Sequence, residues 1–264
     1  MSVLLFLLFL PMDHVVLANE RVPAIAIIID DMGKRIRNGE RIVNLPGPVA
    51  CAFLPYAKYT ADLAQRAFEN NKEILLHLPM QSIYSSPIDP GAITLEMNQE
   101  DVRRVVEESL LAVPYVSGVN NHMGSMLTQH PGHMGWLMSA LQSNGDYFFI
   151  DSRTTAETVA RQVAEDAGLP ASQRNIFLDH DINRKDIEEQ FERLIELAYK
   201  NGTAIAIGHP YPQTLDMLEK RLPELDALGI NLVSVADIIE MQQERSRWQA
   251  SLSPSLRAAK SLKQ

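Results

Sequence analysis

The chain has 264 residues, of which 46% are apolar and 22% are charged, and its formal net charge is −9. This length accommodates a single α/β barrel as well as two smaller domains. The acidic balance argues against nucleic acid or an anionic membrane surface as the main partner. Cys51 is the only cysteine, which excludes an intrachain disulfide, and its apolar neighbours predict a buried, unreactive thiol.

Residues 1–18 have the pattern of a secretory signal peptide. The apolar segment at residues 1–10 is too short for a membrane span of about 20 residues, and Val16-Leu17-Ala18 offers a cleavage site before Asn19. The segment lacks the basic residue that usually begins such a peptide, which leaves a retained anchor or a misassigned start as alternatives. We predict an exported protein, periplasmic or extracellular, with no stable membrane insertion after the signal is removed.

From residue 24 onward, apolar runs alternate with segments of helical periodicity. Unbroken apolar runs are typical of strands buried on both faces, as in parallel sheets. Strands are predicted at residues 24–30, 49–54, 73–79, 115–122, 147–150, 175–178, 203–208 and 231–235. Helices are predicted between them, and Asn98 is expected to cap one of these with Asp101 three residues later. This order predicts a parallel sheet, and the number of units favours a barrel over an open sheet.

Several predicted strands end in a side chain suited to catalysis or metal binding. The carboxyl ends of the strands in a parallel barrel converge on one mouth. The side chains at these ends are Asp30, Asp31, His77, His122, Asp151, Asp179, His180 and His209. Each one alone has a simpler explanation as a helix cap or a hydrogen-bonded structural residue. Their repetition at one end of the sheet instead favours a common site.

Two histidines and one carboxylate, with one position left open, are typical protein ligands of a hydrolytic divalent metal. Such an ion lowers the pKa of a bound water toward about 7 and polarises a carbonyl. A second carboxylate could accept the proton of that water, and another histidine could protonate the leaving group. The residues between 81 and 91 predict an irregular loop long enough to overhang such a site.

At these strand ends the sequence resembles the polysaccharide deacetylases, most closely their divergent branch, over residues 23–241. Ile27–Gly33 is similar to the first motif of that family. The other four motifs are matched around His77, Asn120–Ser125, Asp151 and His209. The resemblance implies one domain over residues 19–250, an α/β fold that forms a single distorted (β/α) barrel of about seven parallel strands. The tail at residues 251–264 has no apolar periodicity, so we predict that it is disordered.

The resemblance also implies roles for individual residues. Asp30 would be the catalytic base and His209 the catalytic acid. Asp31 and His77 would bind a divalent metal, expected to be zinc, and His122 is added to this ligand set by the inference below. Four further residues would orient those groups or hold the substrate: Asn121, Asp151, Arg153 and Asp179. Three tyrosines near strand ends are candidates for stacking on a sugar: Tyr56, Tyr84 and Tyr211.

The sequence departs from the ordinary family pattern at two places. The second metal histidine, expected four residues after the first, is replaced by Gln81, and the Arg of the third motif is replaced within Asn120–His122. We infer that His122 supplies the missing ligand. The resulting hypothesis is an exported, metal-dependent hydrolase that removes acetyl groups from a glycan. The alternative is a catalytically inactive glycan-binding or cell-envelope protein that retains the fold.

Overall fold

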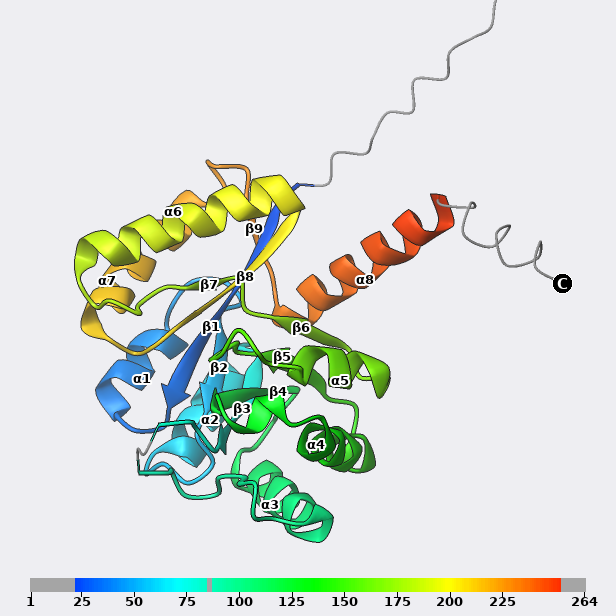
Figure 1. Ribbon diagram of the computed structural model, residues 1–264. Coiled ribbons are helices and arrows are strands. Elements are labelled where there is room, and N and C mark those ends of the chain that lie inside the picture. The colour runs from blue at the N-terminus through cyan, green and yellow to red at the C-terminus, as the bar shows by residue number, and fades with distance from the viewer. Residues whose placement is uncertain (1–21, 85–86, 253–264) are drawn as a thin grey trace, which may run out of the picture.

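The computed structural model describes residues 22–84 and 87–252 (Figure 1). The predicted signal peptide at residues 1–18 lies outside the described residues, as do residues 253–264 of the predicted tail. Among the described residues, no helix combines the length and apolar character needed to cross a bilayer.

The strands form one curled sheet in which all the pairings are parallel. Their order across the sheet is β6 (Ala171–Gln173), β5 (Phe148–Asp151), β4 (Gly118–Met123), β3 (Ile74–Met80), β2 (Ala50–Phe53), β1 (Ala24–Met32), β8 (Thr203–Gly208) and β7 (Ile176–Phe177). A ninth strand, β9 (Asn231–Leu232), pairs with the start of β1. The structure confirms the predicted distorted (β/α) barrel. All eight strands predicted from the apolar runs are present, although β7 and β9 are shorter than predicted, and β6, which has no apolar run, is an additional strand.

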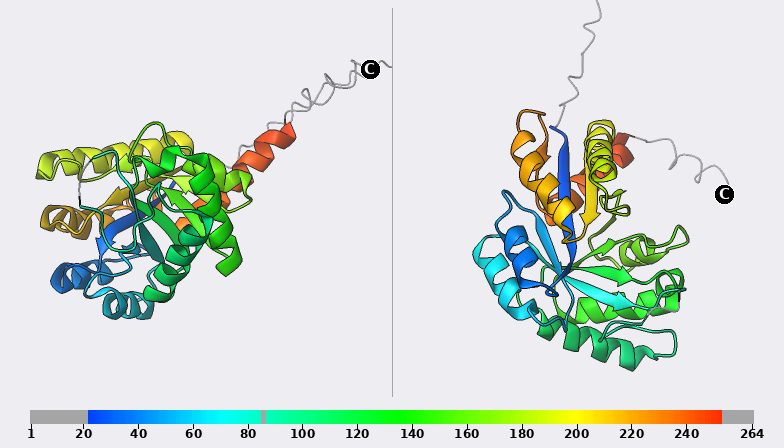
Figure 2. Two further views of the ribbon diagram at one scale, coloured as in Figure 1. Left: turned by 60° about the horizontal axis from the view of Figure 1, so that its bottom comes forward. Right: turned by 90° about the vertical axis from the view of Figure 1, so that its left-hand side faces the viewer.

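The helices are α1 (Ile36–Val43), α2 (Thr60–Glu69), α3 (Gln99–Ala112), α4 (Pro131–Asn144), α5 (Ala160–Asp166), α6 (Arg184–Asn201), α7 (Pro212–Arg221) and α8 (Val235–Leu252), with short 3-10 turns at Leu127–Gln129 and Leu222–Glu224. Helices α1 to α7 connect the strands and cover the outer face of the sheet, whereas the first turns of α8 pack on its inner side (Figure 2). As predicted, Asn98 caps α3. Its side chain accepts hydrogen bonds from the first turn, and Asp101 accepts one from the amide of Asn98.

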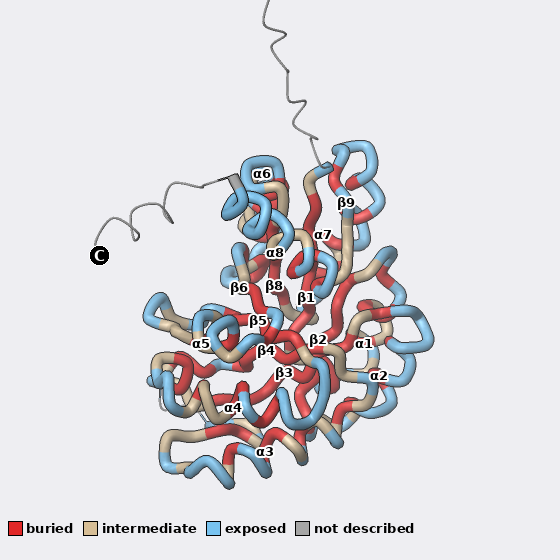
Figure 3. Tube along the Cα trace, turned by 90° about the vertical axis from the view of Figure 1, so that its right-hand side faces the viewer, coloured by how far each residue is buried: buried red, intermediate tan, exposed pale blue. Residues whose placement is uncertain are grey.

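Alternation along β1 separates the two sides of the sheet. Three residues of the strand pack against the outer helices: Ile25, Ile27 and Ile29. The alternate residues Ala24, Ala26 and Ile28 face the inside of the curled sheet. There they pack with the first turns of α8. Figure 3 shows the buried strands enclosed by more exposed helices. Because successive strand residues face opposite sides, the same alternation directs Asp30 inward.

An irregularity at the end of β1 changes the direction of Asp31. The register with β2 shifts between Ile29 and Met32, and Asp31 has a left-handed backbone with φ of 57°. Bulges of this kind re-aim a side chain next to a functional site. As a result, both neighbouring carboxylates reach His77, whose Nε2 lies 3.6 Å from Asp30 Oδ2 and 3.7 Å from Asp31 Oδ1.

Candidate metal centre

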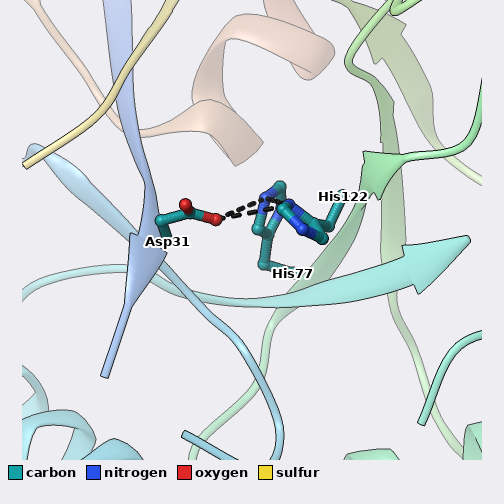
Figure 4. A group of neighbouring side chains, drawn as sticks. All are labelled: Asp31, His77 and His122. Atoms are coloured by element: carbon teal, nitrogen blue, oxygen red, sulfur yellow. Dashed lines mark hydrogen bonds and ion pairs between the residues drawn. The ribbon is translucent and has the colours of Figure 1, made fainter. Parts of the chain in front are cut away.

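Three side chains meet at the carboxyl ends of β1, β3 and β4, and Figure 4 shows Asp31 pointing toward both histidines. His77 Nε2 and His122 Nδ1 lie 3.0 Å apart. Asp31 Oδ1 lies 3.2 Å from His122 Nδ1 and 3.7 Å from His77 Nε2. A tetrahedral zinc ion with bonds of about 2.0–2.1 Å keeps its ligand atoms about 3.3 Å apart. The three atoms therefore form a triangle of the size that such an ion requires.

The outer nitrogen of each histidine is held by an oxygen acceptor. His77 Nδ1 lies 2.9 Å from Asn120 Oδ1, and the amide of Asn120 is oriented because its Nδ2 donates to Asp30 Oδ1 at 2.8 Å. His122 Nε2 lies 2.8 Å from the carboxylate of Asp89. Each outer nitrogen must therefore carry the hydrogen, which leaves the lone pair of the inner nitrogen facing the centre of the triangle.

Three hydrogen-bond acceptors thus face one another without a proton between them. Asp31 Oδ1 is buried and accepts no hydrogen bond. Burial, reinforced by the charge of His122, lowers the pKa of His77 well below its usual range. Burial also lowers the pKa of His122, even though Asp31 opposes the shift. Buried acceptors at 3.0–3.7 Å repel one another unless a cation lies between them, so the donor set fits a divalent metal.

Asp30 is buried beside this triangle. Its Oδ1 accepts the hydrogen bond from Asn120, while its Oδ2 faces His77. Burial raises the pKa of Asp30 to about 7, although the charge of His209 and the hydrogen bond from Asn120 act in the opposite direction. A carboxylate with a pKa near neutrality is suited to accept a proton.

His209 follows β8 and is held by Asp179. Asp179 Oδ1 lies 3.0 Å from His209 Nδ1, and Oδ2 accepts hydrogen bonds from the His209 amide and from Thr214. Burial alone would lower the pKa of His209, but the hydrogen bond with Asp179 and the charge of Asp30 outweigh it, and the pKa is raised. A histidine that keeps its proton near neutral pH is suited to act as an acid.

A cavity of about 200 Å³ lies between the loops that follow β1 and β8. Asp31 and His209 line it from opposite loops, and Lys34 and Tyr211 also border it. Lys34 Nζ lies 3.1 Å from Asp31 Oδ2, which places a cation at the same opening. The cavity therefore borders one ligand of the triangle, Asp31, and His209.

The remaining predicted site residues support the loops at the strand ends. Asn121 accepts a hydrogen bond from the Ser152 amide and donates one to the Met123 carbonyl. Asp151 accepts hydrogen bonds from the Arg153 amide and from Thr158. Asn121 and Asp151 each lie one residue away from an inward-facing position of β4 or β5. Their side chains therefore point away from the inside of the sheet and bond to these loops. Arg153 has φ of 49° and an exposed side chain.

No role was predicted from the sequence for Asn120 or Asp89. Asn120 alternates with His122 along β4, so the period of the strand was a usable signal that both face inward. Asp89 lies in the loop that was expected to overhang the site, but nothing in that loop marks which side chain would reach His122. Gln81, which replaces the second motif histidine, has a structural role. Its side chain accepts a hydrogen bond from the Leu95 amide, which fixes the loop that follows β3.

Comparison with known proteins gives results that agree with this geometry. Residues 27–239 match the family model described as divergent polysaccharide deacetylase. The uncharacterized protein YibQ of Escherichia coli K12 is 35% identical over 242 residues, which cover 92% of this chain and 74% of that protein.

Solved structures share the fold at lower sequence identity. The uncharacterized protein ATU2773 of Agrobacterium tumefaciens C58 superposes with a TM-score of 0.78 at 20% identity, over 82% of this chain and 89% of that one. BA3943 of Bacillus anthracis, described as a CE4 family pseudoenzyme, gives a TM-score of 0.51 at 13% identity, over 82% of this chain and 65% of that one. A mutant of BA3943 is described as having restored enzymatic activity. At these identities the similarity concerns the fold.

Proposed function

Since the chain belongs to the divergent polysaccharide deacetylase family, we propose that it is an exported, metal-dependent hydrolase that removes acetyl groups from a glycan. A fold alone does not specify an activity. The observation that carries the proposal is the triangle of buried acceptors formed by Asp31, His77 and His122. Export is proposed from the signal-peptide pattern of residues 1–18.

Two imidazoles and one carboxylate are a ligand set that suits zinc, and three protein ligands leave a coordination position open. When bound by these residues, the ion would supply Lewis acidity toward an acetyl carbonyl and toward water. The chain's own contribution is to keep both imidazoles neutral and aimed at one point. Asn120 and Asp89 do this by accepting the outer N–H groups.

The two titratable groups beside the triangle take the proton-transfer roles in this proposal. Asp30 accepts a proton from water, with Oδ1 fixed by Asn120 and Oδ2 directed toward the triangle. His209 donates a proton to the departing oxygen or nitrogen of the sugar, and Asp179 keeps it oriented and protonated.

The other predicted residues are proposed either to contact the substrate or to hold the loops around the site. Arg153, exposed at the end of β5, is proposed to bind sugar hydroxyls, and Tyr211 to contact a sugar ring at the cavity rim. Asn121 and Asp151 are proposed to hold the loops that carry Ser152 and Arg153. In this arrangement they position the substrate-facing residues and have no direct contact with the reacting atoms.

A catalytically inactive glycan-binding protein is the second candidate. It is favoured by Gln81, which takes the position of the second motif histidine. The side chain of Gln81 accepts a hydrogen bond from the Leu95 amide and is not among the three residues of the triangle. BA3943, which shares the fold, is described as a pseudoenzyme. An inactive protein of this kind would keep the cavity and bind acetylated glycans without releasing acetate.

Zinc content and acetate release, measured on the same purified protein, test the two candidates. We expect about one zinc per chain after dialysis, and release of acetate from at least one substrate among acetylated chitin oligosaccharides, acetylated xylan and peptidoglycan. Zinc binding with glycan binding but no acetate release from any of them would favour the inactive candidate. A chain that binds no divalent metal would contradict the proposed hydrolase.

A further inference from the structure

Asp89 reaches the centre from outside the sheet. It lies in the connection between β3 and α3, and its side chain is 34% exposed. Its Oδ2 accepts the hydrogen bond from His122 Nε2 at 2.8 Å. This is the nitrogen that points away from the triangle, so Asp89 contacts a metal ligand from behind.

A carboxylate at this position determines the tautomer of the ring. An ionised carboxylate only accepts hydrogen bonds, so His122 must carry its hydrogen on Nε2. The lone pair of Nδ1 is then directed toward Asp31 Oδ1 at 3.2 Å and His77 Nε2 at 3.0 Å. Without an acceptor behind it, His122 could carry the hydrogen on Nδ1, a tautomer that cannot bind a metal ion through that atom.

The two histidines of the triangle have different acceptors behind them. His77 is backed by Asn120, a buried neutral amide on the neighbouring strand. His122 is backed by a charged carboxylate on a loop. Carboxylates behind metal-binding histidines fix the ring and increase its basicity. A second anion also adds negative charge to a centre whose only carboxylate ligand is Asp31.

We propose that Asp89 is a positioning residue of the metal centre, which acts through His122 to aim and strengthen that ligand. The loop that carries Asp89 thereby strengthens His122, which takes the place of the histidine ligand expected at Gln81. The inference rests on the proposed function only in so far as the centre binds a divalent cation, and it does not depend on which bond is hydrolysed.

Lys34 offers a competing explanation for the same carboxylate. Its Nζ lies 3.9 Å from Asp89 Oδ2 and 3.1 Å from Asp31 Oδ2. If Asp89 served only to balance this ammonium group, Lys34→Met would relieve the need for Asp89. The shorter distance of 2.8 Å to His122 favours the histidine as the group on which Asp89 acts.

The affinity for Zn²⁺, measured by competition with a chromophoric chelator, tests the proposal without any glycan. We expect Asp89→Ala to bind Zn²⁺ about 10–100-fold more weakly than the wild type, which is the usual cost of losing such a partner. Asp89→Asn keeps an acceptor without the charge and should fall between the two. Ile88→Ala changes the neighbouring loop residue, which is 48% exposed, and should bind as the wild type does.

A double-mutant cycle then identifies the group through which Asp89 acts. In a His122→Ala background, Asp89→Ala should cause no further loss of Zn²⁺ affinity. An equal loss in both backgrounds would overturn the positioning role, as would a Lys34→Met background that abolishes the effect of Asp89→Ala. Wild-type affinity in Asp89→Ala would overturn this inference alone. Absence of Zn²⁺ binding by the wild type would overturn both this inference and the proposed hydrolase.

Discussion

The metal side of the site (Asp31, His77 and His122) and its acid side (Asp179 and His209) hold similar histidines whose pKa values are shifted in opposite directions. The side chains of His122 and His209 are 11% and 18% exposed, and each ring has a carboxylate partner. Burial lowers the pKa of His122 despite its partner. Burial also opposes protonation of His209, but its pKa is raised, because the hydrogen bond with Asp179 and the charges of Asp30 and Asp179 outweigh burial.

The difference lies in the surroundings of the two carboxylates. The side chain of Asp179 is fully buried and accepts three hydrogen bonds, so its charge is fixed next to the imidazole and shielded from solvent. Asp89 is 34% exposed, and Lys34 near it opposes protonation of His122. A neutral imidazole binds a cation and a protonated one donates a proton. The environment of the carboxylate, more than its presence, therefore assigns the two roles.

Removing a ligand should cause the largest loss of Zn²⁺ affinity. We expect His122→Ala to lose Zn²⁺ affinity by more than about 100-fold, a larger effect than loss of an outer partner, and to lose turnover with it. Gln81→Ala should retain the metal, because that side chain holds the Leu95 amide. Zinc content after parallel dialysis measures both. Retention of zinc in His122→Ala together with its loss in Gln81→Ala would show that the ligand set is wrong.

Asp30→Asn should separate catalysis from metal binding. Loss of a general base usually lowers turnover by about 10²–10⁴-fold. Zinc content should stay at the wild-type level, because Asp30 is not among the three atoms of the triangle. Turnover at the wild-type rate in this variant would reject Asp30 as the base.

The same variant should be more stable than the wild type when both are metal-free. Burial raises the pKa of Asp30 to about 7 in the folded chain, whereas its usual value is 3.8. Ionising it in the folded chain therefore costs up to roughly 4 kcal/mol above pH 7, and this cost disappears as pH falls toward 3.8. Urea denaturation should show the advantage of Asp30→Asn at pH 8 and little advantage at pH 4. An advantage that does not change with pH would contradict the raised pKa.

Asp179→Asn should make the acid side resemble the metal side. Without the charge of Asp179 and the strong hydrogen bond it forms, burial is opposed mainly by the charges of Asp30 and Asp31, and the pKa of His209 falls. Because the acid must be protonated, the alkaline limb of kcat/KM should move to lower pH, with turnover at pH 8 reduced by about 10-fold. Asp181→Asn is the control, since Asp181 is exposed on the same loop.

The pH dependence of stability is an independent test of the interaction between Asp179 and His209. The pKa of His209 is raised in the folded chain, so its stabilising contribution is full below its usual pKa of 6.5 and is lost as pH rises through the folded value. The Tm deficit of Asp179→Asn should therefore be largest below pH 6.5 and shrink at higher pH. An equal deficit at all pH values would mean that only the packing of Asp179 was lost.

The sequence was sufficient to predict the barrel and the meeting of Asp31, His77 and His122. The strands of a parallel sheet are long apolar runs and their ends converge, so the pattern places these residues at one end of the sheet, while the family resemblance indicated which of them form the ligand set. Strand β6 was not predicted, for the converse reason. Ala171–Gln173 pairs through its backbone and has no apolar pattern to mark it.

Finer features depend on alternation and on loop geometry. Strict alternation would have separated Asn121 from Asn120 and His122 on β4, because neighbouring residues face opposite sides. Asp31 could not be placed by alternation, because its left-handed backbone breaks the period. Asp89 is positioned by a loop whose path is set by long-range contacts, such as the one between Gln81 and Leu95. No local pattern encodes such contacts.

Asn120→Asp should give the smallest of these effects, because it changes one atom of the link between His77 of the metal side and the base Asp30. Asn120 accepts from His77 through Oδ1 and donates to Asp30 through Nδ2. An aspartate keeps the acceptor for His77 but replaces the donor with a second carboxylate beside Asp30. We therefore expect Zn²⁺ affinity to be retained, and the pKa of Asp30 to rise further through repulsion between like charges.

The measurable consequence is a shift in the acidic limb of kcat/KM. The base works only when it is deprotonated, so a higher pKa moves this limb toward higher pH, by about one unit or more. Asn120→Ala loses the acceptor as well and should weaken Zn²⁺ binding, which makes it the matched contrast. If Asn120→Asp moved the alkaline limb instead, Asn120 would be acting on His209. If it weakened Zn²⁺ as much as Asn120→Ala does, the acceptor role toward His77 would be refuted.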